Sequence, residues 1–144
     1  MHFITGGAFN GKRAWVKKTY QVDQHDGWLS AYESQKLPHN LADFNQNLVI
    51  LEGIETWLRI LTEEYDIDHS RIIWNSCLND WLSWEKNANG RNLVLIGTDI
   101  SKGIVPLEKE NRIWRDLAGW VYQDTAVKAE KVDVIWYGLN QTIK

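Results

Sequence analysis

The chain has 144 residues, 44% of them hydrophobic, which is enough for one well-buried core and short for two, so we expect a single domain over residues 1–144. The formal net charge at pH 7 is −3 and Lys and Arg form no block, which argues against nucleic-acid or anionic-membrane partners. No apolar run approaches the roughly 18 residues of a membrane span, and Met1-His2-Phe3 leads directly into the first apolar segment without a signal peptide. We therefore expect a cytoplasmic protein with a small ligand.

The first distinctive segment is rich in glycine and lies between a short apolar stretch and a helical one. Phe3–Thr5 predicts a strand and Lys12–Tyr20 predicts a helix, and the segment between them contains the G-x-x-x-x-G-K core of a phosphate-binding loop. Such a turn directs backbone N–H groups and the positive end of a helix dipole at one point, and Lys12 adds an ammonium. We expect the phosphates of a nucleoside triphosphate to bind Gly6, Gly7, Ala8, Phe9, Asn10, Gly11, Lys12 and Arg13.

Arg13 departs from the usual form of this loop. The residue after the lysine is ordinarily Ser or Thr, whose hydroxyl ligates Mg²⁺. A guanidinium has five donors and no acceptor, so Arg13 cannot take that role. Arg13 is instead placed to contact a phosphate, which would favour a nucleotide bound without productive Mg²⁺.

The rest of the chain alternates between apolar segments typical of strands and amphipathic segments typical of helices. We expect strands at Trp28–Tyr32, Leu48–Leu51, Asn92–Ile96 and Val132–Tyr137, and helices from Ile54 to Tyr65, from Asp68 or Ser70 to the stop at Asn89-Gly90, and from Glu108 to Lys128. This alternation predicts an α/β fold, with a mostly parallel sheet, helices on both faces and ligands at the carboxyl ends of the strands. The loop, Glu52 and Asp99 all follow predicted strands.

Tryptophan is unusually frequent, with nine residues. Five of them fall at helical spacings beside Leu and Ile, which predicts core or subunit contacts rather than base stacking: Trp57, Trp74, Trp81, Trp84 and Trp114. We therefore expect a homo-oligomer. The single cysteine, Cys77, lies in the same helical pattern and is expected to be a buried core thiol.

Several separated segments resemble the adenosylcobinamide kinase / adenosylcobinamide-phosphate guanylyltransferase family of cobalamin synthesis. Ile4-Thr5-Gly6-Gly7-Ala8 with Gly11-Lys12 is similar to the opening of that family, and Leu51-Glu52 resembles a strand end within it. Its C-terminal signatures resemble Gly103-Ile104-Val105-Pro106, Arg115-Asp116-Leu117-Ala118-Gly119 and Gln123. The resemblance implies a P-loop sheet related to RecA-like folds and a cytoplasmic homo-oligomer. It also implies that ATP or GTP phosphorylates adenosylcobinamide and that GMP is then attached.

The chain is shorter than the family pattern before Glu52. Family members carry there a helix with His-His-Lys-Asp-Gly-Arg-Pro, whose histidine accepts GMP covalently. Either His25-Asp26-Gly27 is its remnant, with His25 as nucleophile and Glu33 as a later acid, or Trp28–Tyr32 is the second strand and the histidine helix is missing. The second interpretation is favoured, because a doubly wound sheet needs a strand there. His25 is then an ordinary turn residue.

Phosphoryl transfer depends mainly on positioning and charge neutralisation, so the loop, Lys12, a metal and one acid at a neighbouring strand end would suffice. Glu52 is the expected acid. It would hold Mg²⁺ or accept the proton of the substrate hydroxyl; alternatively it caps the helix that begins near Ile54. Glu55 is a weaker second candidate. Asp99 lies where a last nucleotide-contacting loop is expected, or in a solvated turn.

Arg115-Asp116, on a predicted helix, is interpreted as an ion pair or a subunit contact. Three classes of function remain open from the sequence. The first is an enzyme that acts on an adenosylcobinamide-type corrinoid with ATP or GTP and Mg²⁺. The others are a non-catalytic nucleotide-binding member of the same family and a P-loop kinase for another small metabolite. The resemblance favours the enzyme.

Overall fold

The computed structural model describes residues 1–23 and 27–144, and it contains one mostly parallel sheet with helices on both faces. The elements in chain order are β1 His2–Thr5, α1 Lys12–Tyr20, β2 Trp28–Ser30, the short 3-10 helix η1 Ala31–Glu33, β3 Leu48–Glu52, α2 Ile54–Glu64, α3 Ile67–Lys86, β4 Asn92–Ile96, α4 Lys109–Lys128, β5 Lys131–Trp136 and β6 Leu139–Thr142. No helix within these residues is both long and apolar enough to cross a membrane.

The strand order is β2-β3-β4-β1-β5-β6, and every neighbouring pair is parallel except β5 with β6. β1 therefore lies inside the sheet, between β4 and β5. The α/β fold with a mostly parallel sheet is confirmed, but β6 was not predicted. It pairs with β5 across the turn Tyr137-Gly138, whose residues both have positive φ, +49° and +77°. Two such residues match the twist of a tight hairpin.

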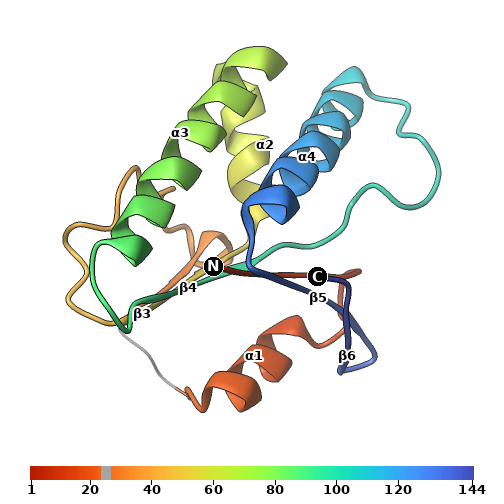
Figure 1. Ribbon diagram of the computed structural model, residues 1–144. Helices are drawn as coiled ribbons and strands as arrows, with labels where there is room; N and C mark the ends of the chain where they lie inside the picture. The colour runs from red at the N-terminus through yellow and green to blue at the C-terminus, as the bar shows by residue number, and fades with distance from the viewer. Residues whose placement is uncertain (24–26) are drawn as a thin grey trace.

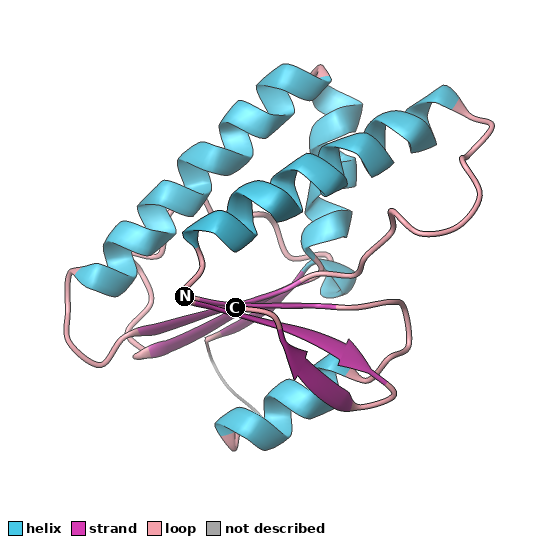
Figure 2. Cartoon of the chain, turned by 45° about the vertical axis from the view of Figure 1, so that its right-hand side comes forward, coloured by secondary structure: helices cyan, strands magenta, loops and turns pink. Residues whose placement is uncertain are grey.

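Three helices cover one face of the sheet and one covers the other (Figures 1 and 2). α2, α3 and α4 lie on the first face, and α1 lies alone on the second. Neighbouring side chains of the inner strands alternate between these faces: Phe3, Leu93 and Leu95 pack beneath the three helices, whereas Ile4 and Val94 pack against α1. Because both faces are buried, the inner strands are largely apolar.

The tryptophans expected in the interior are largely there. Trp57, Trp74, Trp81 and Trp84 are buried under the three-helix face, and Trp74 meets Trp81 edge to face at 5.3 Å between ring centroids. Trp114 is only partly buried against the same cluster. Cys77 is buried among them, so the core-thiol interpretation is confirmed.

Several predicted boundaries differ from the structure by one to three residues, and two of these differences have a visible cause. The second strand ends at Ser30 rather than Tyr32, because the chain turns there into η1. α3 begins at Ile67 rather than after Asp68 or Ser70, since the side chain of Asp66 accepts the His69 backbone N–H at 2.8 Å and caps the helix. The hydroxyl of Ser70 instead donates to the carbonyl of Asp66.

A buried carboxylate joins the C-terminal hairpin to the inner strands. One oxygen of Asp133 accepts hydrogen bonds from Asn140 and Thr142, and the other lies 2.8 Å from His2 Nε2 and 3.1 Å from Lys131 Nζ. Burial opposes ionisation of Asp133, but the hydrogen bonds from Thr142, Asn140 and Lys131 prevail and lower its pKa to about 2.

Asp133→Asn tests this contribution to stability. The folded-state pKa lies below the ordinary value of 3.8, so the charged carboxylate stabilises the fold above about pH 4 and loses that effect as the pH falls towards 2. We expect the variant to lose about 2 kcal/mol of unfolding free energy at pH 7, with a deficit that shrinks between pH 4 and pH 2. Urea unfolding at several pH values measures this, with Asp43→Asn at an exposed position as control. A deficit that does not change with pH would contradict the assignment.

Candidate nucleotide-binding site

The loop between β1 and α1 lies at the carboxyl edge of the sheet and alternates in backbone handedness. Gly6, Phe9 and Gly11 have φ values of +144°, +59° and +87°. Such alternation turns successive N–H groups towards one concave side, the arrangement of an anion-binding nest. A bulky residue such as Phe9 rarely adopts a left-handed backbone conformation, and the side chain of Phe9 is fully exposed. These φ values are compatible with such a nest, and phosphate binding by the loop stays a prediction.

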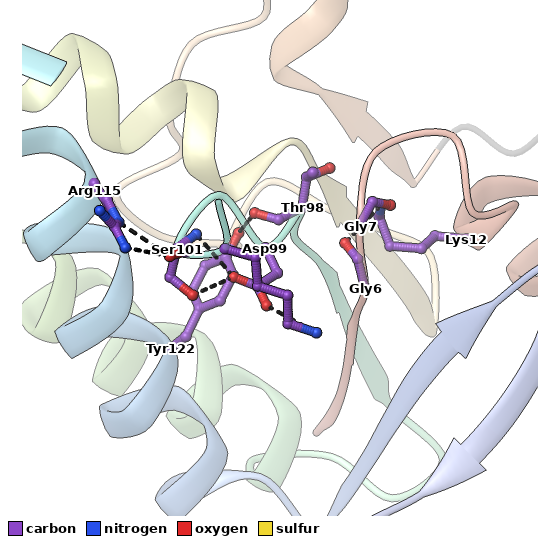
Figure 3. Close-up of polar contacts among 9 residues, drawn as sticks. Gly6, Gly7, Lys12, Thr98, Asp99, Ser101, Arg115 and Tyr122 are labelled. Atoms are coloured by element: carbon purple, nitrogen blue, oxygen red, sulfur yellow. Dashed lines mark hydrogen bonds and ion pairs between the residues drawn. The ribbon is translucent and has the colours of Figure 1, made fainter. Parts of the chain in front are cut away.

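Two neighbouring segments hold the loop in place. The backbone N–H of Asp99, after β4, donates to the carbonyl of Gly6 at 2.9 Å, and Figure 3 shows this segment beside the loop. On the other side Gly138 donates to the carbonyl of Asn10 at 2.9 Å. Beneath the loop, a Cβ added to Gly6 would lie 2.4 Å from the carbonyl oxygen of Ile135. Glycine is thus required at position 6 by close approach as well as by φ.

Lys12 is buried, with 8% of its surface exposed, and its ammonium spans the loop. Nζ donates to the carbonyls of Gly6 at 3.1 Å and Gly7 at 2.8 Å. Burial lowers the pKa of Lys12, and the nearby carboxylates of Glu55, Glu52 and Asp99 oppose that shift. The site thus holds a cation whose present partners are two loop carbonyls, and phosphate oxygens are stronger partners for an ammonium than carbonyls are.

Glu52, the last residue of β3, is 4% exposed and faces the loop. Its Oε2 accepts the indole N–H of Trp28 at 2.9 Å and lies 3.6 Å from a guanidinium nitrogen of Arg13. The alternative role left open by the sequence, a helix cap, is wrong: Gly53 is the N-cap of α2, and no side-chain hydrogen bond caps that helix.

Arg13 lies between two carboxylates and an aromatic ring. It donates to Glu33 at 3.0 Å, approaches Glu52, and has its guanidinium carbon 5.4 Å from the centroid of the Trp28 ring. The side chains of Arg13 and Glu33 are 46% and 58% exposed. The structure thus brings Glu33 to the loop, but as a partner of Arg13.

A cavity of about 470 Å³ opens beside these groups. Among the described residues, its walls contain three cationic side chains, Lys12, Arg13 and Lys17, and one carboxylate, Glu52, which suits an anionic ligand. The lining residues are Phe9, Gly11, Lys12, Arg13, Ala14, Lys17, Tyr32 and Glu52. Lys17 and Tyr32 were not predicted. Lys17 was detectable as the cation one turn after Arg13 on α1, whereas no local pattern indicates Tyr32.

Glu55, the second candidate for the acid, already accepts hydrogen bonds from other groups of the protein. It is 5% exposed, accepts hydrogen bonds from the Tyr32 hydroxyl and from the Thr98 backbone N–H at 2.7 Å, and lies 3.4 Å from the Tyr122 hydroxyl. Burial, followed by the hydrogen bond to Glu55, raises the pKa of Tyr32, so the phenol stays protonated and donates. Glu55 therefore braces η1, α2 and the segment after β4 around the cavity.

One further predicted residue falls outside the description, and another lies beside the loop without lining the cavity. His25 falls within residues 24–26, which the structure does not describe. Asp99 pairs with Lys102 at 3.7 Å. The other interpretation of the shortened segment is confirmed in outline, because Trp28–Ser30 forms β2 and pairs with β3.

Arg115 donates to the carbonyl of Ser101 at 2.6 Å and 3.0 Å (Figure 3). This contact ties the start of α4 to the segment after β4. Among the described residues, neither Arg115 nor Asp116 forms an ion pair, and the predicted subunit contact stays a prediction.

A protein-bound Mg²⁺ ion does not fit this set of donors. Mg²⁺ in nucleotide sites takes one or two oxygen ligands from the protein and fills its remaining positions with phosphate and water. Position 13 offers a guanidinium, which has no lone pair to donate. Glu52 already accepts from Trp28 and lies against Arg13, so a divalent cation there would face a charge of its own sign.

The sheet order, the loop at its carboxyl edge and the buried lysine define a P-loop α/β fold. The chain belongs to the cobinamide kinase / cobinamide phosphate guanyltransferase family, whose sequence model matches residues 18–143. That match begins after the loop, so the loop is an observation in addition to the match. A relative, the Bifunctional adenosylcobalamin biosynthesis protein CobU of Escherichia coli (strain K12), is 29% identical over 117 residues. The alignment covers 72% of this chain and 62% of the relative, so the chain spans less than two thirds of its length.

Gly6→Ala tests the fit between loop and sheet. The added Cβ would collide with the backbone of Ile135 at a φ that alanine rarely adopts, so the loop must move. We expect the free energy of unfolding to fall by about 1–3 kcal/mol and triphosphate binding to fall below detection. Gly119→Ala is the matched control, since it lies in α4 with open space around it and should be neutral or slightly stabilising. Thermal unfolding measures the stability of each variant, and a titration with GTP measures its binding. Wild-type binding by the Gly6 variant would contradict the account.

Proposed function

We propose that the chain binds ATP or GTP at Gly6–Arg13 and transfers the terminal phosphoryl group to a hydroxyl of a cobinamide-type corrinoid. The observation that carries this proposal is the cavity at the carboxyl edge, where a buried ammonium and two further cations line the nest of the loop. Membership of the cobinamide kinase / cobinamide phosphate guanyltransferase family supports the corrinoid as acceptor.

The residues of this chain divide the work of such a transfer. The loop N–H groups and Lys12 hold the β- and γ-phosphates and neutralise the charge that develops on them. The acceptor oxygen forms its bond to the γ-phosphorus while the bond from that phosphorus to the β–γ bridging oxygen breaks, and the nucleoside diphosphate leaves with the electron pair. Glu52 accepts the proton of the acceptor hydroxyl, because it is the carboxylate that lines the cavity.

Guanylyl transfer is not part of this proposal. Within the described segment between β2 and β3, the helical structure is confined to η1, and the histidine is His39. The His39 ring lies 3.9 Å from Cys77 Sγ and lines a different cavity from the one beside Lys12. These observations support a member of the family that has the phosphate loop without a GMP-carrying histidine among the residues that the structure describes.

A second candidate is a non-catalytic nucleotide-binding protein of the same family. It is favoured by the contacts of Glu52, whose carboxylate is engaged by Trp28 and Arg13. Both contacts fall on the same oxygen, Oε2, where they compete with the proton of an acceptor hydroxyl. Turnover separates the two candidates.

The oligomeric state and the location remain predictions. Large apolar side chains such as Ile104, Leu107 and Leu139 are at least 74% exposed, which supports a homo-oligomer.

Lys12→Ala and Glu52→Gln test the two roles. Losing the ammonium should weaken triphosphate binding about ten- to a hundredfold, the usual effect of one charge-assisted contact. Glu52→Gln should leave affinity within about threefold and lower turnover with adenosylcobinamide at least tenfold, because it removes a base and keeps the shape. Calorimetry and a phosphorylation assay give both values. Unchanged binding by a folded Lys12 variant would remove the loop from the account, and a wild-type protein that binds without turnover would favour the second candidate.

Incubation with labelled GTP tests the missing guanylyl step. We expect no covalent GMP on the protein by intact-mass analysis, since the described residues place no histidine beside the phosphate loop. A phosphoramidate adduct that maps to His25 would contradict this expectation and restore a two-step mechanism.

A further inference from the structure

Arg13 stands at the point of the loop where a metal-ligating hydroxyl is usual, and it carries a permanent positive charge there. It follows Lys12 in the first turn of α1 and lines the same cavity. Its guanidinium also approaches Glu52, the acid at the neighbouring strand end, at 3.6 Å. The Arg13 guanidinium is therefore a permanent cation between the loop and the carboxylate of Glu52.

The two carboxylates that contact Arg13 differ in burial. Glu52 is fixed in the interior and held by the indole of Trp28, so its attraction for Arg13 is weakly screened. Glu33 is 58% exposed, and exposed ion pairs contribute little to stability. Arg13 can therefore exchange Glu33 for a stronger partner at small cost while it stays beside Glu52.

A phosphate group is such a partner. Its oxygens accept two parallel hydrogen bonds from a guanidinium, and such charge-assisted pairs exceed an exposed Arg–Glu contact in strength. The carboxylate of Glu33 now occupies a position on Arg13 that a terminal phosphate would take once Lys12 and the loop hold the rest of the chain of phosphates.

We infer that Arg13 replaces Mg²⁺ as the cation of this site: the triphosphate binds without a protein-held metal, and its terminal phosphate displaces Glu33 from the Arg13 guanidinium. This inference rests on the proposed function and specifies how the same site takes its nucleotide. Any Mg²⁺ that accompanies the nucleotide is then held by phosphate oxygens and water. Glu33 acts as a competitor for Arg13, so it weakens nucleotide binding.

The test is a calorimetric titration with GTP and with ATP, each with excess Mg²⁺ and with EDTA. Wild-type affinity should differ by less than about threefold between the two conditions. Arg13→Ser should lose about tenfold or more in EDTA and regain part of it with Mg²⁺, because it removes a charge-assisted contact and supplies a metal-ligating hydroxyl. Glu33→Gln should bind more tightly than wild type in EDTA.

Arg59→Ser is the matched control. Arg59 is a half-exposed arginine that also stacks on an indole, with its guanidinium carbon 5.0 Å from the centroid of Trp114, and pairs with an exposed carboxylate, Glu63, at 3.6 Å. Its replacement should leave both affinities unchanged. Arg13→Lys keeps the charge without the planar fork, and it should retain more affinity in EDTA than Arg13→Ser.

Three results would overturn the inference. Wild-type binding that needs Mg²⁺ by tenfold or more, or an Arg13→Ser variant that binds as wild type does in EDTA, would refute it and leave the proposed function standing. If neither nucleotide binds wild type under either condition, the inference and the proposed function both fail. Circular dichroism of each variant keeps loss of folding separate from loss of binding.

Discussion

Burial of the Lys12 ammonium is the constraint on which the site depends. An unpaired buried cation is costly, and here that cost is offset by two loop carbonyls and by carboxylates from three neighbouring segments, Glu52, Glu55 and Asp99. Those carboxylates converge because β3, β4 and β1 are adjacent and parallel, so that their carboxyl ends meet at one edge. The sheet order therefore brings these carboxylates close to the Lys12 ammonium. In our account, a phosphate binds at a site that is already organised around this cation.

The differences between this chain and its family concern the same few residues. Arg13 stands in the metal-ligating position, and the segment between β2 and β3 has no α-helix among its described residues. The chain also spans 62% of the length of the relative in Escherichia coli. In our account, the site keeps the positioning and the positive charge on which phosphoryl transfer mainly depends. In our account it has neither a covalent carrier for GMP nor a metal held by the protein.

Much of the fold was predictable from local patterns. The inner strands are largely apolar and the helices have a helical apolar period, so the α/β fold and the place of the loop followed from the sequence. The hairpin strand β6 was missed because it depends on positive φ at Tyr137 and on the buried Asp133, which pairs with Asn140 and Thr142. Its own residues, Leu139–Thr142, are exposed and have no apolar alternation.

The sequence predicted only the part of the site that is formed by consecutive residues. Gly6 to Arg13 form one continuous motif, whereas the contacts that define the chemistry join residues far apart in the sequence. Glu33 reaches Arg13 because η1 turns the chain after β2, and Tyr32 reaches Glu55 through the same turn. Nothing in the spacing of these residues indicates such pairs. The sequence identified Arg13 as unusual, but its partners required the tertiary structure.

The central claim is that a guanidinium, and not a protein-bound metal, completes the phosphate site. A crystal structure of the protein with a non-hydrolysable GTP or ATP analogue, grown with Mg²⁺ present, tests it most directly. The account predicts a terminal phosphate in bidentate contact with Arg13, the Glu33 carboxylate released, and no bond from Glu52 to a metal. A Mg²⁺ ion coordinated by Glu52, with Arg13 turned away from the phosphates, would contradict it.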